Sequence, residues 1–271
     1  MTCIIMDMTG MKNLRKYGNE PYTVVVIHGG PGAPGEMAPV ARELSTRHGV
    51  LEILNATATL DGQVQEILTV LKEHGDIPIT LIGHSWGAML AYIFAARYPL
   101  LVKKLIMVCS GVFEARYAKD IMETRLARLD EKDLLNFNEL MEKIYDPAVA
   151  NKNAPFTLLG KLISKVDSFH PLPRDDDMME CSYEVFQGVW DDAEELRSSG
   201  ELIGLGAKII CPVVAIHGDH DPHPAEGVRE PLSRVLGDFR FIIVEKCGHY
   251  PWLERFAKDR FYDILREELC G

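Results

Sequence analysis

Ser85 is the residue whose surroundings in the sequence most clearly indicate chemistry. It stands at the centre of Gly-His-Ser-Trp-Gly, residues 83–87. The apolar, β-branched run 77–82 before it predicts a buried strand, and the run 88–97 after it, rich in helix formers, predicts a helix. A turn this sharp tolerates only small neighbours, and it presents the hydroxyl at a helix N-terminus, where free N–H groups stabilise an anion. The pattern predicts that Ser85 is a nucleophile.

A serine nucleophile needs a base that takes its proton and an acid that holds the base in the right tautomer. Two loops that follow predicted strands offer these groups, one with Asp219 and Asp221 and the last with His249. We expect the loops to meet at the carboxyl edge of the sheet, where open α/β sheets bind ligands. Pro222 holds the residue before it extended, which favours Asp221 as the acid, whereas Asp219 is close enough to its strand to brace the turn.

The same chemistry needs two backbone N–H groups that hold the oxyanion of a tetrahedral intermediate. The N–H of Trp86, at the start of the predicted helix, is the first candidate. The loop His-Gly-Gly-Pro-Gly at residues 28–32 is the source of the second, since glycines let the backbone approach a substrate closely. Its proline has no N–H, so Gly29 or Gly30 must donate. We expect His28 to brace this loop and not to act as a base.

The elements that must position these residues alternate between strand and helix up to about residue 111, and again after residue 205. This alternation predicts an α/β protein with a mostly parallel sheet, right-handed crossovers and helices on both faces. Residues 2–8 and part of 10–20 are expected to add short edge strands. The other expected strands are 22–27, 50–54, 77–82, 102–108, 212–217 and 239–244, and the expected helices are 36–46, 61–74, 88–97, 225–236 and 252–269.

Residues 112–205 have a different character. Four charged segments with helical periodicity replace the strands, at 114–129, 131–145, 156–166 and 178–197. Because the alternation of strand and helix resumes directly afterwards, we interpret 112–205 as a helical lid inserted into a core formed by 1–111 and 206–271. The alternative is a helical half of the core itself.

The composition limits partners and location. The formal net charge of −11 argues against nucleic acid or an anionic membrane surface as partner. The six cysteines form no C-x-x-C pair, and in a chain of 271 residues they are expected to be thiols. No stretch approaches the roughly 20 apolar residues of a membrane span, and the N-terminal residues lack a basic region. We therefore expect a cytoplasmic protein.

A metal site is the competing interpretation of one stretch. His217, His220 and His223 are spaced His-x-x-His-x-x-His beside two aspartates. One of these histidines ends a predicted strand and the others lie in a loop constrained by prolines, so their convergence on one ion is not expected. We therefore expect neither a metal nor another cofactor.

Four motifs together give the chain a resemblance to serine hydrolases of the α/β-hydrolase fold over nearly its whole length. They are His-Gly-Gly-Pro-Gly at 28–32, Gly-His-Ser-Trp-Gly at 83–87, His-Gly-Asp-His-Asp at 217–221 and Gly-His at 248–249. The first two are most similar to those of prolyl iminopeptidases. The resemblance implies a triad in the order serine, aspartate, histidine with Asp221 as its acid, and Gly30 as the oxyanion donor beside Trp86.

The chain departs from prolyl iminopeptidases at one motif. These enzymes usually carry Asp-x-Arg-Gly-x-Gly-x-Ser after the strand corresponding to 50–54, where this chain has Asn-Ala-Thr-Ala-Thr-Leu at 55–60. The resemblance therefore implies a hydrolase that cleaves an ester or amide of a small molecule or short peptide through an acyl-enzyme, with carboxylic esters slightly favoured. An N-terminal aminopeptidase, an acyltransferase and a non-enzymatic ligand receptor on the same fold are the alternatives.

Overall fold

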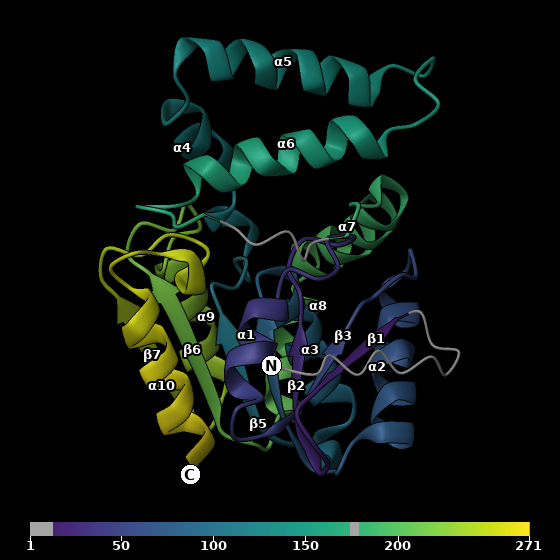
Figure 1. The fold of residues 1–271 in the computed structure, drawn as a ribbon, viewed down its shortest axis with the longest axis vertical. Coiled ribbons are helices and arrows are strands. Elements are labelled where there is room, and N and C mark those ends of the chain that lie inside the picture. The colour runs from purple at the N-terminus through teal and green to yellow at the C-terminus, as the bar shows by residue number, and fades with distance from the viewer. Residues whose placement is uncertain (1–12, 174–178, 271) are drawn as a thin grey trace.

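A sheet of seven strands organises the chain in this computed structural model, which describes residues 13–173 and 179–270 (Figure 1). The strand order is β1-β3-β2-β4-β5-β6-β7. β1 runs antiparallel to β3, and the other neighbouring strands are parallel. The α/β fold with a mostly parallel sheet is therefore confirmed. The strands are β1 Leu14–Tyr17, β2 Tyr22–Ile27, β3 Gly49–Ile53, β4 Ile79–His84, β5 Val102–Val108, β6 Val213–Gly218 and β7 Phe239–Val244.

Helices cover both faces of the sheet. Alternate residues of β2 divide between two buried cores because successive side chains of a strand point to opposite faces. Val24 and Val26 pack with α1 and α10, and Val25 and Ile27 pack with α2, α3 and α9. These helices are α1 Ala38–Leu44, α2 Leu60–His74, α3 Trp86–Arg97, α9 Glu226–Val235 and α10 Lys258–Cys270.

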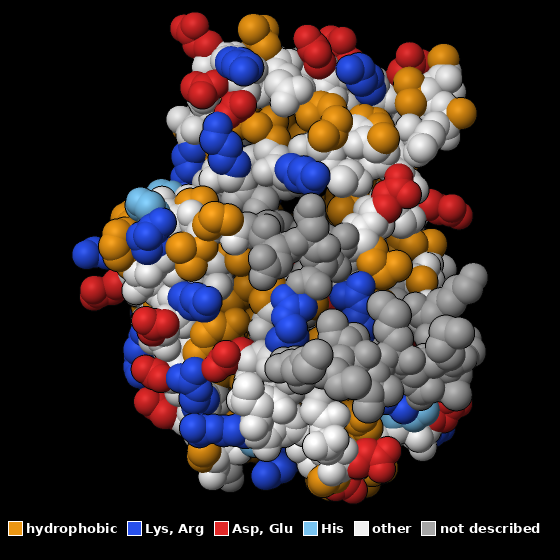
Figure 2. Space-filling model, in the orientation of Figure 1, with side chains coloured by type: hydrophobic (Ala, Val, Ile, Leu, Met, Phe, Trp, Pro, Cys, Tyr) orange, Lys and Arg blue, Asp and Glu red, His pale blue; other side chains and the backbone are white. Residues whose placement is uncertain are grey.

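The chain between β5 and β6 is helical in its described part. α5 and α6 lie above the carboxyl edge of the sheet and pack on each other, with apolar side chains between them (Figures 1 and 2). α8 instead packs against helices of the core: it contacts α9, and its Ile203 O accepts a hydrogen bond of 3.0 Å from the Tyr92 hydroxyl of α3. That residues 112–205 act as a lid remains a proposal. The helices are α4 Ile121–Ala127, α5 Glu131–Tyr145, α6 Asn153–Val166, α7 Tyr183–Ser198 and α8 Glu201–Gly204, with short 3-10 turns at η2 Ala115–Tyr117 and η3 Leu205–Lys208.

Long-range contacts shorten two of the expected helices at their start. The helix expected at 114–129 is wrong in its first half, because η2 is tied to α9 by the Tyr117 hydroxyl, which donates to Glu230 at 2.5 Å. The helix expected from 252 begins only at Lys258 in α10, after the 3-10 turn η4 Pro251–Leu253. The residue after this turn, Glu254, has an extended backbone and forms a β-bridge with Pro171. Beside it, Leu253 O accepts the N–H of Leu172. Long-range pairing has overridden local propensity in both places.

Two further expected elements can be compared with the structure only in part. The edge strand expected at residues 2–8 lies outside the described residues, and β1 lies within the segment 10–20. The helix expected from 178 begins at Tyr183 in α7, where the Ser182 side chain caps it by accepting the N–H of Val185. In the part of the chain that the structure describes, no helix is long and apolar enough to cross a membrane.

The closest backbone contact around the sheet is made where α3 leaves β4. A Cβ on Gly83 would lie 2.1 Å from the carbonyl oxygen of Gly87, and a Cβ on Gly87 would lie 2.4 Å from those of Ile27 and His28 in β2 and just after it. Real Cβ atoms do not approach backbone oxygens this closely. Glycine at these positions therefore lets the first turn of α3 rest directly on two strands.

This contact predicts opposite effects of alanine at two helical glycines. Gly87→Ala forces α3 away from β2 and is expected to lower the free energy of unfolding by about 2–4 kcal/mol. Gly160→Ala, in α6 where a Cβ meets nothing within 4 Å, is expected to raise it by about 0.5–1 kcal/mol. Urea unfolding of both variants measures the difference. Equal stabilities would contradict the close packing of α3 on the sheet.

Candidate active site

Ser85 lies between β4 and α3 in a backbone conformation that residues with a side chain rarely adopt. Its φ is 52° and its ψ is −116°. Its N–H donates to Val108 O at 2.9 Å, and its own carbonyl accepts the N–H of Ala88 at 3.1 Å. The turn is thus held from both sides. Such local strain persists only where the surroundings enforce it, and it is concentrated at functional sites.

His249 and Asp221, which the sequence places in separate loops, are hydrogen-bonded to each other. The distance between His249 Nδ1 and Asp221 Oδ2 is 2.7 Å, and both side chains are buried. Because a carboxylate only accepts, Nδ1 carries the hydrogen, and Nε2 of the neutral ring is left to accept a proton. This is the tautomer that a general base requires.

The surroundings of Asp221 keep it ionised. Burial alone would raise the pKa of this carboxyl, but the imidazoles of His249, His217 and His223 outweigh burial and hold its pKa well below the usual range. The carboxylate therefore stays charged across the range in which imidazoles titrate, and it can stabilise a protonated His249 throughout.

Asp219 has a different partner. Its Oδ1 accepts the N–H of Cys247 at 3.0 Å, and its own N–H donates to Val244 O at 3.1 Å. The side chain therefore braces the loop that carries His249 against the loop that carries Asp221. The structure brings Asp221, and not Asp219, to the imidazole.

The ring of His249 lies beside the turn that carries Ser85. Its centroid is 4.8 Å from that of His84, the residue before the serine. Among the described residues the Ser85 hydroxyl makes no hydrogen bond, so its proton is not yet shared with the imidazole. Hydrogen bonds of this kind often tighten only when a substrate binds.

The glycine loop at 28–32 faces the same turn, since a Cβ on Gly29 would lie 3.0 Å from the Cβ of Ser85. The N–H of Gly29 is already used, because it donates to Glu36 Oε2 at 2.9 Å. Within residues 13–173 and 179–270, the N–H groups of Gly30 and Trp86 donate to no protein acceptor. Of the two glycines that the sequence left open, Gly30 is the one with an available donor.

Glu36 is a functional residue that the sequence analysis missed. Besides Gly29 N–H, its Oε2 accepts from His84 Nδ1 at 2.8 Å, and His84 Nε2 lies 2.8 Å from the carbonyl oxygen of His249. Since a carboxylate and a carbonyl only accept, this geometry has both nitrogens of His84 donating. One buried network therefore joins the glycine loop, the serine turn and the backbone of His249. The buried Glu36 gave no sequence signal because it lies at the edge of an expected helix.

His28 is buried and its Nδ1 is 2.8 Å from Gly29 O, within its own loop. Burial lowers the pKa of this imidazole, which keeps it neutral. The expectation that His28 braces the loop agrees with these contacts.

Glu254 holds the histidine loop from the other side. Its buried carboxylate accepts the N–H groups of Gly248 at 3.0 Å, Phe169 at 2.6 Å and His170 at 2.7 Å. The segment after α6 is thereby fastened to the loop of His249. A sequence pattern cannot reveal this residue, because two of its three partners are backbone groups about 85 residues away.

The helical region also reaches the base directly. His249 N–H donates to Asp167 O at 2.8 Å, and the carboxylate of Asp167 forms a two-point ion pair with Arg125 of α4, with distances of 2.9 and 2.7 Å. Asp167 is fully buried. The position of the His249 backbone therefore depends on α4 and on the end of α6.

The histidines weighed as metal ligands do not converge as a set. His220 contacts the ring of Phe169, whereas His217 and His223 lie close to Asp221. Two groups could approach a cation together, one of them Asp221, His223 and His249, and the other Cys109, His217 and Asp221. In the first, both imidazoles already bond to the carboxylate at 2.7 and 2.8 Å. A cation there would have to replace the protons of both hydrogen bonds.

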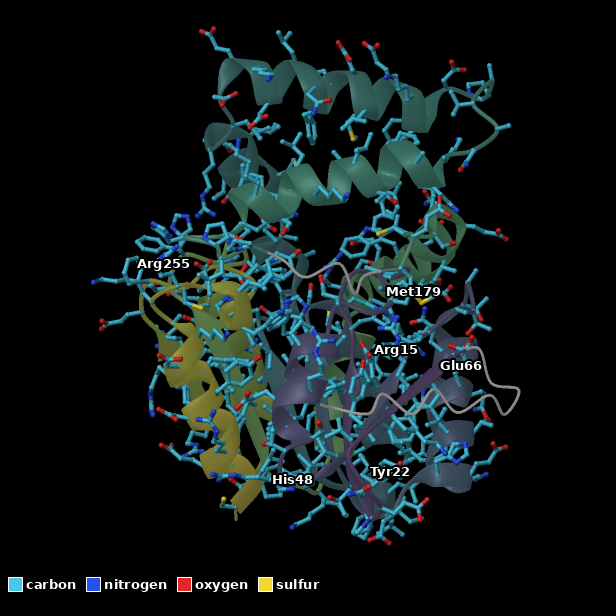
Figure 3. All side chains as sticks on the ribbon, in the orientation of Figure 1. Arg15, Tyr22, His48, Glu66, Met179 and Arg255 are labelled. Carbon is cyan, nitrogen blue, oxygen red and sulfur yellow. The ribbon has the colours of Figure 1, made fainter. Side chains whose placement is uncertain are left out.

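α7 lies against the loops around the serine turn. Ser182 N–H donates to Gly32 O at 2.9 Å, and Met179 N–H donates to Pro34 O at 2.9 Å. Met179, labelled in Figure 3, lies near the start of α7, and Glu66 lies below it on α2. Glu66 in turn accepts backbone N–H groups of residues 56 and 57, within the segment 55–60 where the chain departs from prolyl iminopeptidases.

A cavity of about 220 Å³ opens between these parts. Among the described residues, its lining includes the apolar Val185 and Pro34, Gly32 of the glycine loop, and the acidic Glu180. Its place beside the glycine loop makes it a candidate for holding part of a substrate.

Comparison with known proteins agrees with this geometry. The model of the alpha/beta hydrolase family matches residues 24–263. The proline iminopeptidase of Saccharolobus solfataricus is 22% identical over an alignment of 274 positions that covers 90% of this chain and 83% of that protein. Lipase 3 of Moraxella sp. is 23% identical over 243 residues, which cover 85% and 72%. The solved structure of VinJ has a TM-score of 0.69 and 18% identity over 94% of this chain and 93% of that one.

The chain belongs to the alpha/beta hydrolase family, since the family model covers most of its length. Its relatives include an iminopeptidase and a lipase, so it is an enzyme of the hydrolase class. The resemblance to prolyl iminopeptidases found in the motifs is confirmed.

The network around Glu36 predicts a stability effect. Glu36→Ala leaves two buried N–H donors, those of Gly29 and His84, without this acceptor, and is expected to lower the free energy of unfolding by about 2–4 kcal/mol. Glu139→Ala, on the exposed side of α5, serves as the matched control and is expected to change it by less than about 0.5 kcal/mol. Urea unfolding measures both variants, and an unaffected Glu36→Ala protein would contradict the role of this network.

Proposed function

We propose that this enzyme is a serine hydrolase that cleaves a carboxylic ester of a small molecule through an acyl-enzyme. The observation that carries the proposal is the hydrogen bond of 2.7 Å between His249 Nδ1 and the buried Asp221, beside a strained serine turn. A buried aspartate that fixes an imidazole next to a partly buried serine is an arrangement suited to acyl transfer.

The proposed mechanism has two halves. His249 Nε2 takes the proton of Ser85 as its oxygen attacks the carbonyl carbon, and the N–H groups of Gly30 and Trp86 hold the oxyanion. His249 then gives that proton to the leaving group as the acyl-enzyme forms. In the second half His249 takes a proton from water as the water oxygen attacks the acyl-enzyme, and it returns that proton to the Ser85 oxygen as the acid is released. Asp221 holds the tautomer and stabilises the imidazolium in both halves.

The second candidate is an N-terminal aminopeptidase of the prolyl type. The iminopeptidase relative and the carboxylate of Glu180 at the cavity support it, because a carboxylate suits a substrate's free amino group. The apolar side chains at the same cavity support an acyl chain instead. An acyltransferase, in which another nucleophile replaces water, would use the same residues. The cytoplasmic location and the small-molecule or short-peptide substrate expected from the sequence belong to this proposal.

A panel of p-nitrophenyl acyl esters and aminoacyl arylamides, prolyl included, tests the proposal. We expect turnover of the esters, covalent labelling of Ser85 by a fluorophosphonate, and loss of both in Ser85→Ala by about 10⁴-fold or more. Turnover of amides only when their amino group is free, together with a raised KM for them in Glu180→Gln, would decide for the aminopeptidase. Labelling or turnover that persists in Ser85→Ala would overturn the nucleophile.

The two neighbouring aspartates give a sharper prediction for the acid. Asp221→Asn keeps the shape but removes the charge that fixes and stabilises the imidazole, so kcat on an active ester is expected to fall by about 10³–10⁴-fold. Asp219→Asn loses only a brace to Cys247 N–H and is expected to cost less than about tenfold, mainly through loop stability. If Asp219→Asn is the inactive variant, Asp221 is not the acid.

A further inference from the structure

Asp221 carries a second imidazole besides that of His249. His223 Nδ1 lies 2.8 Å from Asp221 Oδ1, and the backbone N–H of His223 donates to the same oxygen at 2.9 Å. Since a carboxylate only accepts, Nδ1 of His223 donates here, as Nδ1 of His249 does to the other oxygen. The two rings lie side by side, with centroids 4.7 Å apart and planes inclined by 31°. One buried carboxylate is thus shared by two imidazoles.

The position of His223 is fixed from behind. Its carbonyl oxygen accepts a hydrogen bond of 2.8 Å from Nε2 of His217, the buried histidine near the end of β6. Pro222 and Pro224 flank it in the chain and restrict the backbone on both sides. The backbone of the loop therefore fixes His223 beside Asp221. Only 12% of the His223 side chain is exposed.

We propose that His223 is a positioning residue for the proposed reaction: through its ring Nδ1 and its backbone N–H it holds Asp221 by Oδ1 so that Oδ2 faces His249. The proposal rests on the function proposed above, in which His249 is the base. It assigns a role to a histidine that the triad does not include.

Other charged or titratable groups also face the pair, and they limit which comparison is clean. Arg125 of α4 and Arg128, just after that helix, interact electrostatically with Asp221, and Arg125 is paired with Asp167. Burial raises the pKa of Cys109 at the end of β5, so this thiol stays neutral. His217 and His84 remain in every variant compared. Differences between variants at position 223 therefore report on His223 itself.

The test measures the rate of fluorophosphonate labelling of Ser85 at pH 8 in the full-length enzyme. His223→Asn places an amide N–H where imidazole Nδ1 stands, so it keeps a donor to Asp221, whereas His223→Ala removes that donor. We expect the Asn variant to keep the rate within about threefold and the Ala variant to lose about tenfold or more.

His220→Asn is the matched control, since His220 is on the same loop but its ring contacts Phe169 and not Asp221. Its labelling rate at pH 8 is expected to stay within about twofold of the wild type, and circular dichroism checks that each variant is folded. An Ala variant with an unchanged rate, an Asn variant as slow as the Ala variant, or an equal loss in the control would each overturn the role of His223. Failure of the wild type to label at Ser85 would instead overturn the proposed function.

Discussion

The backbone contact between α3 and the sheet is the constraint on which the rest of the site depends. Because residues 83 and 87 have no side chain, the first turn of α3 rests on the carbonyl oxygens of Ile27 and His28, and its own Gly87 carbonyl lies against Gly83 of β4. Between these two glycines the chain turns through Ser85, which has a positive φ. The strain at the serine accompanies the close packing of a helix that is buried from Trp86 to Ala96, and hydrogen bonds to Val108 and Ala88 fix it.

The buried carboxylates of Glu36 and Glu254 and the exposed carboxylate of Asp219, and not side-chain packing alone, hold the loops in register around this turn. Glu36 binds the glycine loop, Glu254 binds the histidine loop, and Asp219 ties that loop to the one before it. Each of them accepts backbone N–H groups that a loop buried away from water could not leave unpaired. A carboxylate can accept several such bonds at once, so a single side chain fixes two or more segments. These residues do no chemistry, yet the geometry of the proposed triad depends on them.

The sequence predicts the part of this structure that local patterns encode. The strand before Ser85, the helix after it and the order of β-strands follow from apolar periodicity, and Asp221 follows from its place before Pro222. The sequence did not reveal Glu36, Glu254, Asp167 or His223, because their partners lie far away in the chain or, for His223, because its neighbours suggested a metal. For the same reason, the helices expected at 114–129 and 252–269 are longer than those in the structure. Contacts with α9 and with residues 170–172 decide those segments, and a local pattern carries no information on them.

The link between the helical region and the base is the least expected consequence of these contacts. His249 is held at its N–H by Asp167 O and at its carbonyl by His84, so its backbone is fastened to the insertion on one side and to the serine turn on the other. Asp167 is in turn bound by two nitrogens of the Arg125 guanidinium, one to each carboxylate oxygen, in an ion pair whose side chains are largely buried. Breaking such a pair by moving one partner leaves an uncompensated buried charge, which costs far more than a surface contact. α4 and the end of α6 are therefore part of the support of the imidazole, whereas α5 and the outer part of α6, which pack mainly on each other, are free of that role.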